Sequence, residues 1–293
     1  MEVCWGSHLT DEFSMKITLT VVIEGKKRKK KVTVLTKEDI MSMKSGEMKL
    51  TKRMVLSLVM VQYDPLGLIS PLLVKAKILL RRLYGPGQVD WDTPIPLEER
   101  AAWTHFMMEV LNMEPINFTR STRPKGAVGQ PWVVGFCDGS LSAFSALIYV
   151  LWTLPKDIKD GGNQKFERKV TLLMAKRRVA PVHGTTIPRM EMQGLTVLSG
   201  MMNTSVGALP DKVERAILVG DSECSIACLE KTGGTLGPYL ANRSSEIHDN
   251  LDKLREVVEE VEPVWHIPGH LNPVDLGTCG HVTPEEVGSG SIW

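Results

Sequence analysis

Four carboxylate residues in the second half of the chain stand where strands are expected to end or helices to begin. They are Asp138, Glu191, Asp221 and Asp275. Ligands gather outside the strand ends of open α/β sheets, so carboxylates from separated segments can converge there. A site with only oxygen ligands suits a hard cation, Mg²⁺ or Mn²⁺. Two such ions about 3.5–4 Å apart can clamp a phosphodiester during in-line displacement.

Each of these acids also has an ordinary structural explanation when it is taken singly. An Asp after a strand often caps the next helix, as Asp221 would before Ser-Glu-Cys-Ser. An acid in the first turn of a helix, where we expect Glu191, is favoured by the helix dipole. The metal-site hypothesis therefore depends on all four lying along one edge of the same sheet.

The elements that would position these acids can be predicted from the second half of the chain. β-branched and apolar segments predict strands at 131–137, 143–151, 169–179, 215–219 and 262–267. Helical patterns occur at 188–202, 222–230 and 243–260. The order β-β-β-α-β-α-α-β predicts an α/β (α+β) fold with a mixed five-stranded sheet and crossover helices.

The sequence of the first half predicts a β-hairpin followed by helices. Met15–Ile23 and Lys31–Leu35 predict an N-terminal β-hairpin, and helices are expected at 50–63, 70–85 and 97–111. Residues 117–130 lack periodicity and predict a linker, with the domain boundary near 125.

Basic residues concentrate at two places in this first half. The hairpin tip carries six in succession, Lys26, Lys27, Arg28, Lys29, Lys30 and Lys31, and the second helix carries Lys75, Lys77, Arg81 and Arg82. The tip is explained either by a solvated turn or by a phosphate contact or localisation signal.

Composition limits the class of protein. The 293 residues suggest two domains, and 35 Lys and Arg against 34 Asp and Glu give a net charge of +1. That near-neutrality hides a net charge of +6 over residues 1–125 and −5 over residues 126–293. A membrane-length apolar segment and a secretory signal are both missing. Five scattered cysteines favour reduced thiols inside a cell.

Strings of residues in three parts of the chain resemble known retroelement sequences. Residues 131–280, with IPRMEMQGL, ILVGDSECSIACL and VWHIPGHLNPVD, resemble the ribonuclease H domain of retroelement polyproteins. RMVLSLVMVQYDPLGLISPLLVKAKILLRRLYG, followed by VDWDTPIPLEER, resembles the segment between reverse transcriptase and ribonuclease H in BEL/Pao-type LTR retrotransposons. The tail DLGTCGHVTPEEVGSGSIW is also similar to that family. The resemblance implies a reverse transcriptase palm remnant at 1–40, a mainly helical connection region at 41–125, a ribonuclease H-like domain at 126–280 and a truncated tail at 281–293.

The resemblance also implies a function. Asp138, Glu191, Asp221 and Asp275 would hold two Mg²⁺ ions, with Mn²⁺ as a substitute, for hydrolysis of the RNA strand of an RNA/DNA hybrid. His270 would assist proton transfer or product release, although an exposed loop histidine explains it equally well. His266 is expected to be structural. The partners would be the hybrid, contacted by the basic residues of the first half, and the remainder of a pol polyprotein. The implied location is cytoplasmic, in a virus-like particle, with nuclear access.

The sequence also departs from the full retroelement pattern. The polymerase motif Tyr-x-Asp-Asp is missing, which argues against polymerisation, and so are the Asp-Thr-Gly and Asp-Ser-Gly signatures of an aspartic peptidase. Cys279 stands where the family string carries an arginine. The alternative hypothesis is a non-catalytic, nucleic-acid-binding remnant, which would bind a hybrid without Mg²⁺-dependent cleavage.

Overall fold

The second half of the chain forms one mixed sheet. The computed structural model describes residues 2–5, 11–24, 30–85, 89–156, 165–231, 235–275, 278 and 282–287. The sheet contains β6 (Val128–Gly139), β7 (Ala143–Lys156), β8 (Lys165–Val179), β9 (Arg215–Gly220), β10 (Glu260–Val261) and β11 (Trp265–His266). Its order is β10-β9-β6-β7-β8, with β11 also pairing with β9. β6, β7 and β8 are antiparallel neighbours, and β9 runs parallel to β6.

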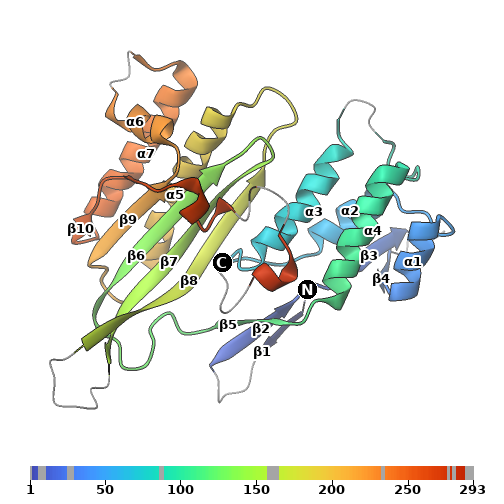
Figure 1. The fold of residues 1–293 in the computed structure, drawn as a ribbon, viewed down its shortest axis with the longest axis horizontal. Coiled ribbons are helices and arrows are strands. Elements are labelled where there is room, and N and C mark those ends of the chain that lie inside the picture. The colour runs from blue at the N-terminus through green and yellow to red at the C-terminus, as the bar shows by residue number, and fades with distance from the viewer. Residues whose placement is uncertain are drawn as a thin grey trace.

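Three helices accompany this sheet: α5 (Ile187–Ala208), α6 (Glu223–Glu230) and α7 (Pro238–Arg255). α5 packs on one face of β6 and β7, and α7 packs on α5. Val133, Ile148, Leu198 and Ile247 belong to the apolar core between these layers. The predicted mixed α/β fold and its element order are therefore confirmed (Figure 1).

Two element boundaries differ from the prediction because of prolines. α7 begins at Pro238 rather than at residue 243, since proline at the first helical position costs no hydrogen bond. The expected fifth strand is two short pieces, β10 and β11, separated by a segment that contains Pro263. Proline cannot donate a backbone hydrogen bond to a strand ladder.

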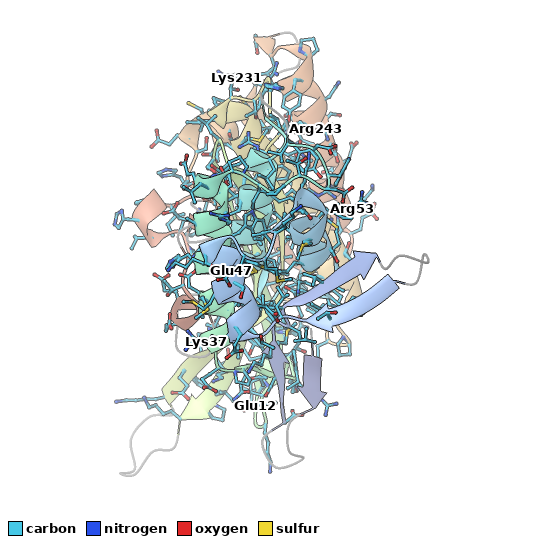
Figure 2. The ribbon with its side chains drawn as sticks, turned by 90° about the vertical axis from the view of Figure 1, so that its right-hand side faces the viewer. Glu12, Lys37, Glu47, Arg53, Lys231 and Arg243 are labelled. Carbon is cyan, nitrogen blue, oxygen red and sulfur yellow. The ribbon has the colours of Figure 1, made fainter. Side chains whose placement is uncertain are left out.

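Two small sheets are formed by the described residues of the first half. β1 (Glu2–Trp5), β2 (Glu12–Lys16) and β5 (Ile116–Thr119) form an antiparallel sheet, and β3 (Thr20–Glu24) pairs with β4 (Lys30–Val34). The hairpin is confirmed as β3–β4, which Figure 2 shows projecting from the side of the molecule. The expected single strand Met15–Ile23 is wrong, because β2 and β3 belong to different sheets. β5 also overlaps the expected linker, which begins at residue 117.

In the described part of the first half there are also four α-helices: α1 (Lys37–Ser45), α2 (Lys52–Met60), α3 (Ser70–Arg82) and α4 (Leu97–Asn112). The last three confirm the predicted helices. α1 was not predicted, although Thr36 and Asp39 form a capping box at its start and Gly46 ends it at φ +93°. It crosses residue 40, where the sequence placed a domain boundary. Among the helices described here, none has the length and apolar character that a bilayer span requires.

The Asp-Pro-Leu-Gly turn before α3 joins the two halves. Asp64 accepts hydrogen bonds from the backbone N–H groups of Leu68 and Ile69, at 2.9 and 3.0 Å. The carbonyl of Leu66 accepts a 2.7 Å hydrogen bond from the N–H of Ala175 on β8. α3 then packs along β8, so the connection helices cover part of the sheet face that α5 leaves open (Figure 1).

Candidate active site

Three carboxylates from three elements meet at one edge of the large sheet. β6 and β9 are parallel, with Cys137 opposite Gly220, so Asp138 and Asp221 lie side by side where these strands end. Glu191 joins them from α5. One carboxylate oxygen from each of Asp138, Glu191 and Asp221 lies within 4.8 Å of the other two. We call these three residues the carboxylate cluster.

Two glycines allow α5 to approach the end of β6 so closely. A Cβ at Gly139 would overlap the backbone of Met190 and Glu191. A Cβ at Gly194 would lie 2.8 Å from the carbonyl oxygen of Asp138. Larger residues at these positions would push the helix away from the strand, so both glycines serve to bring Glu191 to Asp138.

The ordinary explanations for two of these acids do not hold in the structure. The N-cap of α6 is Ser222, whose hydroxyl oxygen accepts a hydrogen bond from the N–H of Ser225 at 3.3 Å. Asp221 is therefore not the N-cap of this helix. Glu191 lies in the second turn of α5 rather than in the first, because the helix begins at Ile187. The helix dipole therefore does little to explain an acid at this position.

The carboxylate of Asp138 is fixed by hydrogen bonds. The N–H of Gly139 donates to its Oδ1 at 2.6 Å, and the hydroxyl of Thr278 donates to its Oδ2. Thr278 is buried and its carbonyl accepts a hydrogen bond from Ser140 at 3.1 Å. Asn272 donates to the carbonyl of Cys137 at 2.9 Å and also hydrogen-bonds Asp221. Thr278 and Asn272 thus orient two members of the cluster.

Burial and mutual repulsion raise the pKa values of the cluster. Burial is the main cause in each case, and it raises the pKa of Asp138 to about 6 and that of Glu191 to about 8. The charges of Asp138 and Asp221 add to the effect on Glu191. The pKa of Asp221 is raised by burial as well, against its hydrogen bond from Asn272. Three acids with raised pKa values in contact favour a cation that neutralises them.

The donor set fits a hard divalent cation. All three groups are carboxylates, which Mg²⁺ and Mn²⁺ prefer. Asp221 Oδ1 is buried and accepts no hydrogen bond from the described residues, so this oxygen is available to a metal. Asp138, Glu191 and Asp221 would hold the ion or ions, and Asn272 and Thr278 would orient the ligands from behind.

The other sequence-predicted site residues lie outside the carboxylate cluster. Asp275 is exposed, but it is near enough for its charge to raise the pKa values of Asp138 and Asp221. His270 is exposed on a 3-10 turn, Gly269–Leu271. His266, which the sequence suggested was structural, lies with Nε2 3.2 Å from the carbonyl oxygen of Asp221.

The proposed nucleic-acid-binding residues are mostly engaged or undescribed. Lys26, Lys27, Arg28 and Lys29 lie outside the described residues, and Lys30 and Lys31 are described only as backbone of β4. Lys75 is paired with Glu109 at 2.7 Å, with its side chain 16% exposed. Arg81 donates to the carbonyl of Pro181 at 2.7 Å. Lys77 is half-buried and Arg82 is exposed, so Arg82 is the most accessible cation of that helix.

A comparison with protein families identifies the class of this chain. The family model described as Pao retrotransposon-like RNaseH-like domain matches residues 51–222. Because the match covers more than half of the 293 residues, the chain belongs to this family. The matched region runs from the start of α2 to the residue after Asp221, so it contains the whole carboxylate cluster together with the connection helices α2, α3 and α4.

Solved structures with a ribonuclease H fold show a distant likeness. The N-terminal RNase H domain of a Mycobacterium tuberculosis protein, solved as a fusion with maltose-binding protein, has a TM-score of 0.31 at 15% identity, covering 49% of this chain and 86% of that chain. RNase H1 from the halophilic archaeon Halobacterium salinarum has a TM-score of 0.25 at 15% identity, covering 47% and 86%. No curated protein sequence matches the chain.

Proposed function

We propose that this chain is a metal-dependent ribonuclease H that hydrolyses the RNA strand of RNA/DNA hybrids. The observation that carries the proposal is the approach of Asp138, Glu191 and Asp221 to within 4.8 Å at the sheet edge. The family description supports a ribonuclease H-type hydrolase of retrotransposon origin. We extend the proposal to Mg²⁺ as the cation, with Mn²⁺ as a substitute, and to a pol polyprotein acting in the cytoplasm or a virus-like particle.

Asp138 and Asp221 have distinct roles within the carboxylate cluster in this proposal. Bound divalent cations would supply Lewis acidity to activate a water and to stabilise the leaving 3′ oxygen. Asp138, held by Gly139 and Thr278, offers a carboxylate whose orientation is fixed before substrate binds. Asp221 offers a buried oxygen that accepts no hydrogen bond from the part of the chain that the structure describes. We assign to Asp275, whose charge acts on Asp138 and Asp221, and to the exposed His270 the contacts with the substrate from the solvent side.

Loss of one cluster carboxylate tests the proposal. We expect Glu191→Gln and Asp221→Asn to lower the rate of hybrid cleavage. The decrease should exceed the roughly 10–100-fold that follows from removing a residue that only orients a metal ligand. The measurement is cleavage of an end-labelled RNA/DNA hybrid by the full chain with Mg²⁺ and with EDTA. Asp249→Asn is a matched control, because Asp249 is an exposed acid on α7 away from the cluster.

The same assay separates the enzyme from the alternative remnant. Cleavage by Asp221→Asn at the wild-type rate would refute the assignment of the cluster. Salt-dependent binding of the hybrid by the wild-type chain, without Mg²⁺-dependent cleavage, would support a non-catalytic nucleic-acid-binding remnant instead.

A further inference from the structure

A buried arginine lies in the same cross-strand row as Asp138. On β7, Ser145 is paired with Asp138 of β6 on one side and with Arg177 of β8 on the other. Directly opposed residues of antiparallel strands point to the same face of a sheet. Neighbouring strands lie about 4.8 Å apart, so the backbones of Asp138 and Arg177 are separated by about 10 Å.

Arg177 is enclosed although its neighbours are not. It is 6% exposed, whereas Lys176 and Arg178 on the same strand point to solvent. Burial lowers the pKa of Arg177 to about 9, against the opposing effect of the Asp138 charge, so the guanidinium is still positively charged at neutral pH. Ser145, which lies between the two in the row, is fully buried and carries no charge.

The row supplies a positive charge close to the cluster of three acids. Like charges within 4.8 Å repel one another, and burial strengthens that repulsion. The positive charge of Arg177, on the same face of the sheet and two strands away from Asp138, offsets part of that repulsion. The same charge also repels any divalent cation that enters the cluster, at low effective dielectric and with little screening by salt.

We propose that Arg177 is a positioning residue that serves as the internal counter-ion of the carboxylate cluster and limits its affinity for divalent cations. The inference rests on the proposed function, because it requires the cluster to be a metal site. Arg177 stabilises the metal-free arrangement of the cluster. A bound cation is attracted by the same Asp138 carboxylate and is repelled by the charge of Arg177. The site therefore loads at a higher cation concentration than three carboxylates alone would need.

A titration of the full chain with Mn²⁺ tests this role. The electron paramagnetic resonance signal of free Mn²⁺ reports how much ion is bound, independently of activity. We expect Arg177→Met, which keeps length but removes charge, to bind Mn²⁺ about tenfold more tightly or better. Arg177→Lys should stay near the wild-type affinity because it retains the charge. Arg178→Met is the matched control, since the charge of Arg178 is exposed and screened.

A second readout does not depend on truncating the arginine. Ser145→Asp places a negative charge beside Arg177 in the same row and offsets it, so this variant should also tighten Mn²⁺ binding. In thermal melts, added Mn²⁺ should raise the midpoint of Arg177→Met by more than that of the wild type. Unchanged affinity in both Arg177→Met and Ser145→Asp would overturn the counter-ion role.

Glu191→Gln separates failure of this inference from failure of the metal site. If the wild type and Glu191→Gln bind Mn²⁺ equally weakly, the cluster is not a metal site and the proposed function fails with it. If Glu191→Gln weakens binding while Arg177→Met and Arg177→Lys both match the wild type, the metal site stands and only the role of Arg177 is refuted.

Discussion

The carboxylates of the cluster titrate across the pH range in which the protein would act. With pKa values of about 6 for Asp138 and about 8 for Glu191, both acids must lose a proton before they can bind a cation. Metal binding is therefore coupled to proton release at this edge of the sheet. Affinity for Mg²⁺ should rise as the pH increases through that range.

The same shifts give the metal-free protein a pH-dependent stability. The pKa of Glu191 is raised from 4.5 to about 8, so between these values the folded chain binds a proton that the unfolded chain has released. The contribution of this Glu191 proton to the free energy of unfolding is complete below about pH 4.5 and is lost as the pH rises through 8. We expect the metal-free melting temperature, followed by circular dichroism, to fall between pH 6 and about pH 8.5. Saturating Mg²⁺ should reduce that fall.

Glu191→Gln provides the control for this titration. Glutamine has no proton to lose, so the variant should show a shallower decline of melting temperature with pH than the wild type. Equal declines in the two proteins would show that the raised pKa of Glu191 does not contribute to the pH dependence.

Residue types could identify some members of the site from sequence but not others. Asp138 and Asp221 follow apolar strands, which is a local signal. Arg177 gives no such signal, because Lys-Arg-Arg in a strand has the pattern of a solvated face, and the pairing of β7 with β8 is what buries it. Thr278 also reaches Asp138 from 140 positions away in the chain.

At the scale of elements, the turn before α3 depends on a glycine. Gly67 has φ +72°, and a Cβ there would overlap the carbonyl of Ala175. We expect Gly67→Ala to reduce the free energy of unfolding by at least about 3 kcal/mol, from left-handed strain plus overpacking. Equilibrium unfolding in urea measures this loss.

Gly129→Ala is the matched control for Gly67→Ala. Gly129 has nearly the same φ, +71°, but an added Cβ there meets nothing within 4 Å. Gly129→Ala should therefore reduce the free energy of unfolding by only about 1 kcal/mol, from backbone strain alone. Similar losses in the two variants would mean that the contact with β8 contributes little to stability.

Elements with local signals were predictable, and those that depend on distant pairing were not. The helix α3 follows from its proline start and apolar stripe. β5 pairs with β2 about 100 residues away, and nothing in its four residues distinguishes it from a linker. The division of Met15–Ile23 between β2 and β3 has the same origin, because only the pairing partners separate these strands.

At the scale of the whole molecule, the two halves share an apolar core. Leu147 of β7 and Ala175 of β8 are buried in one cluster with Leu72 of α3 and Phe106 of α4. Arg123 also pairs with Asp211 across the boundary near 125, at 2.7 Å. The net charge is +6 before that boundary and −5 after it. This change in charge does not coincide with a division between two independent hydrophobic cores.

The shared core predicts cooperative unfolding of the two halves. We expect differential scanning calorimetry of the full chain to show one transition, whose calorimetric and van't Hoff enthalpies agree. Gly67→Ala, which disturbs the contact between the halves, should broaden or split it. Two separate transitions in the wild type would instead establish residue 125 as the boundary between independent folding units.

The docking of Leu66 on β8 has a consequence for self-association. β8 is the outermost strand of its sheet, and its outward N–H and C=O groups could recruit a strand from another molecule. The carbonyl of Leu66 accepts a hydrogen bond from one of these donors, the N–H of Ala175. The pairing of β7 with β8 is also interrupted by a bulge, between Ile148 and Tyr149 of β7. The exposed side chains of Lys176 and Arg178 follow in β8. The turn that joins the two halves thus also protects an exposed sheet edge from aggregation.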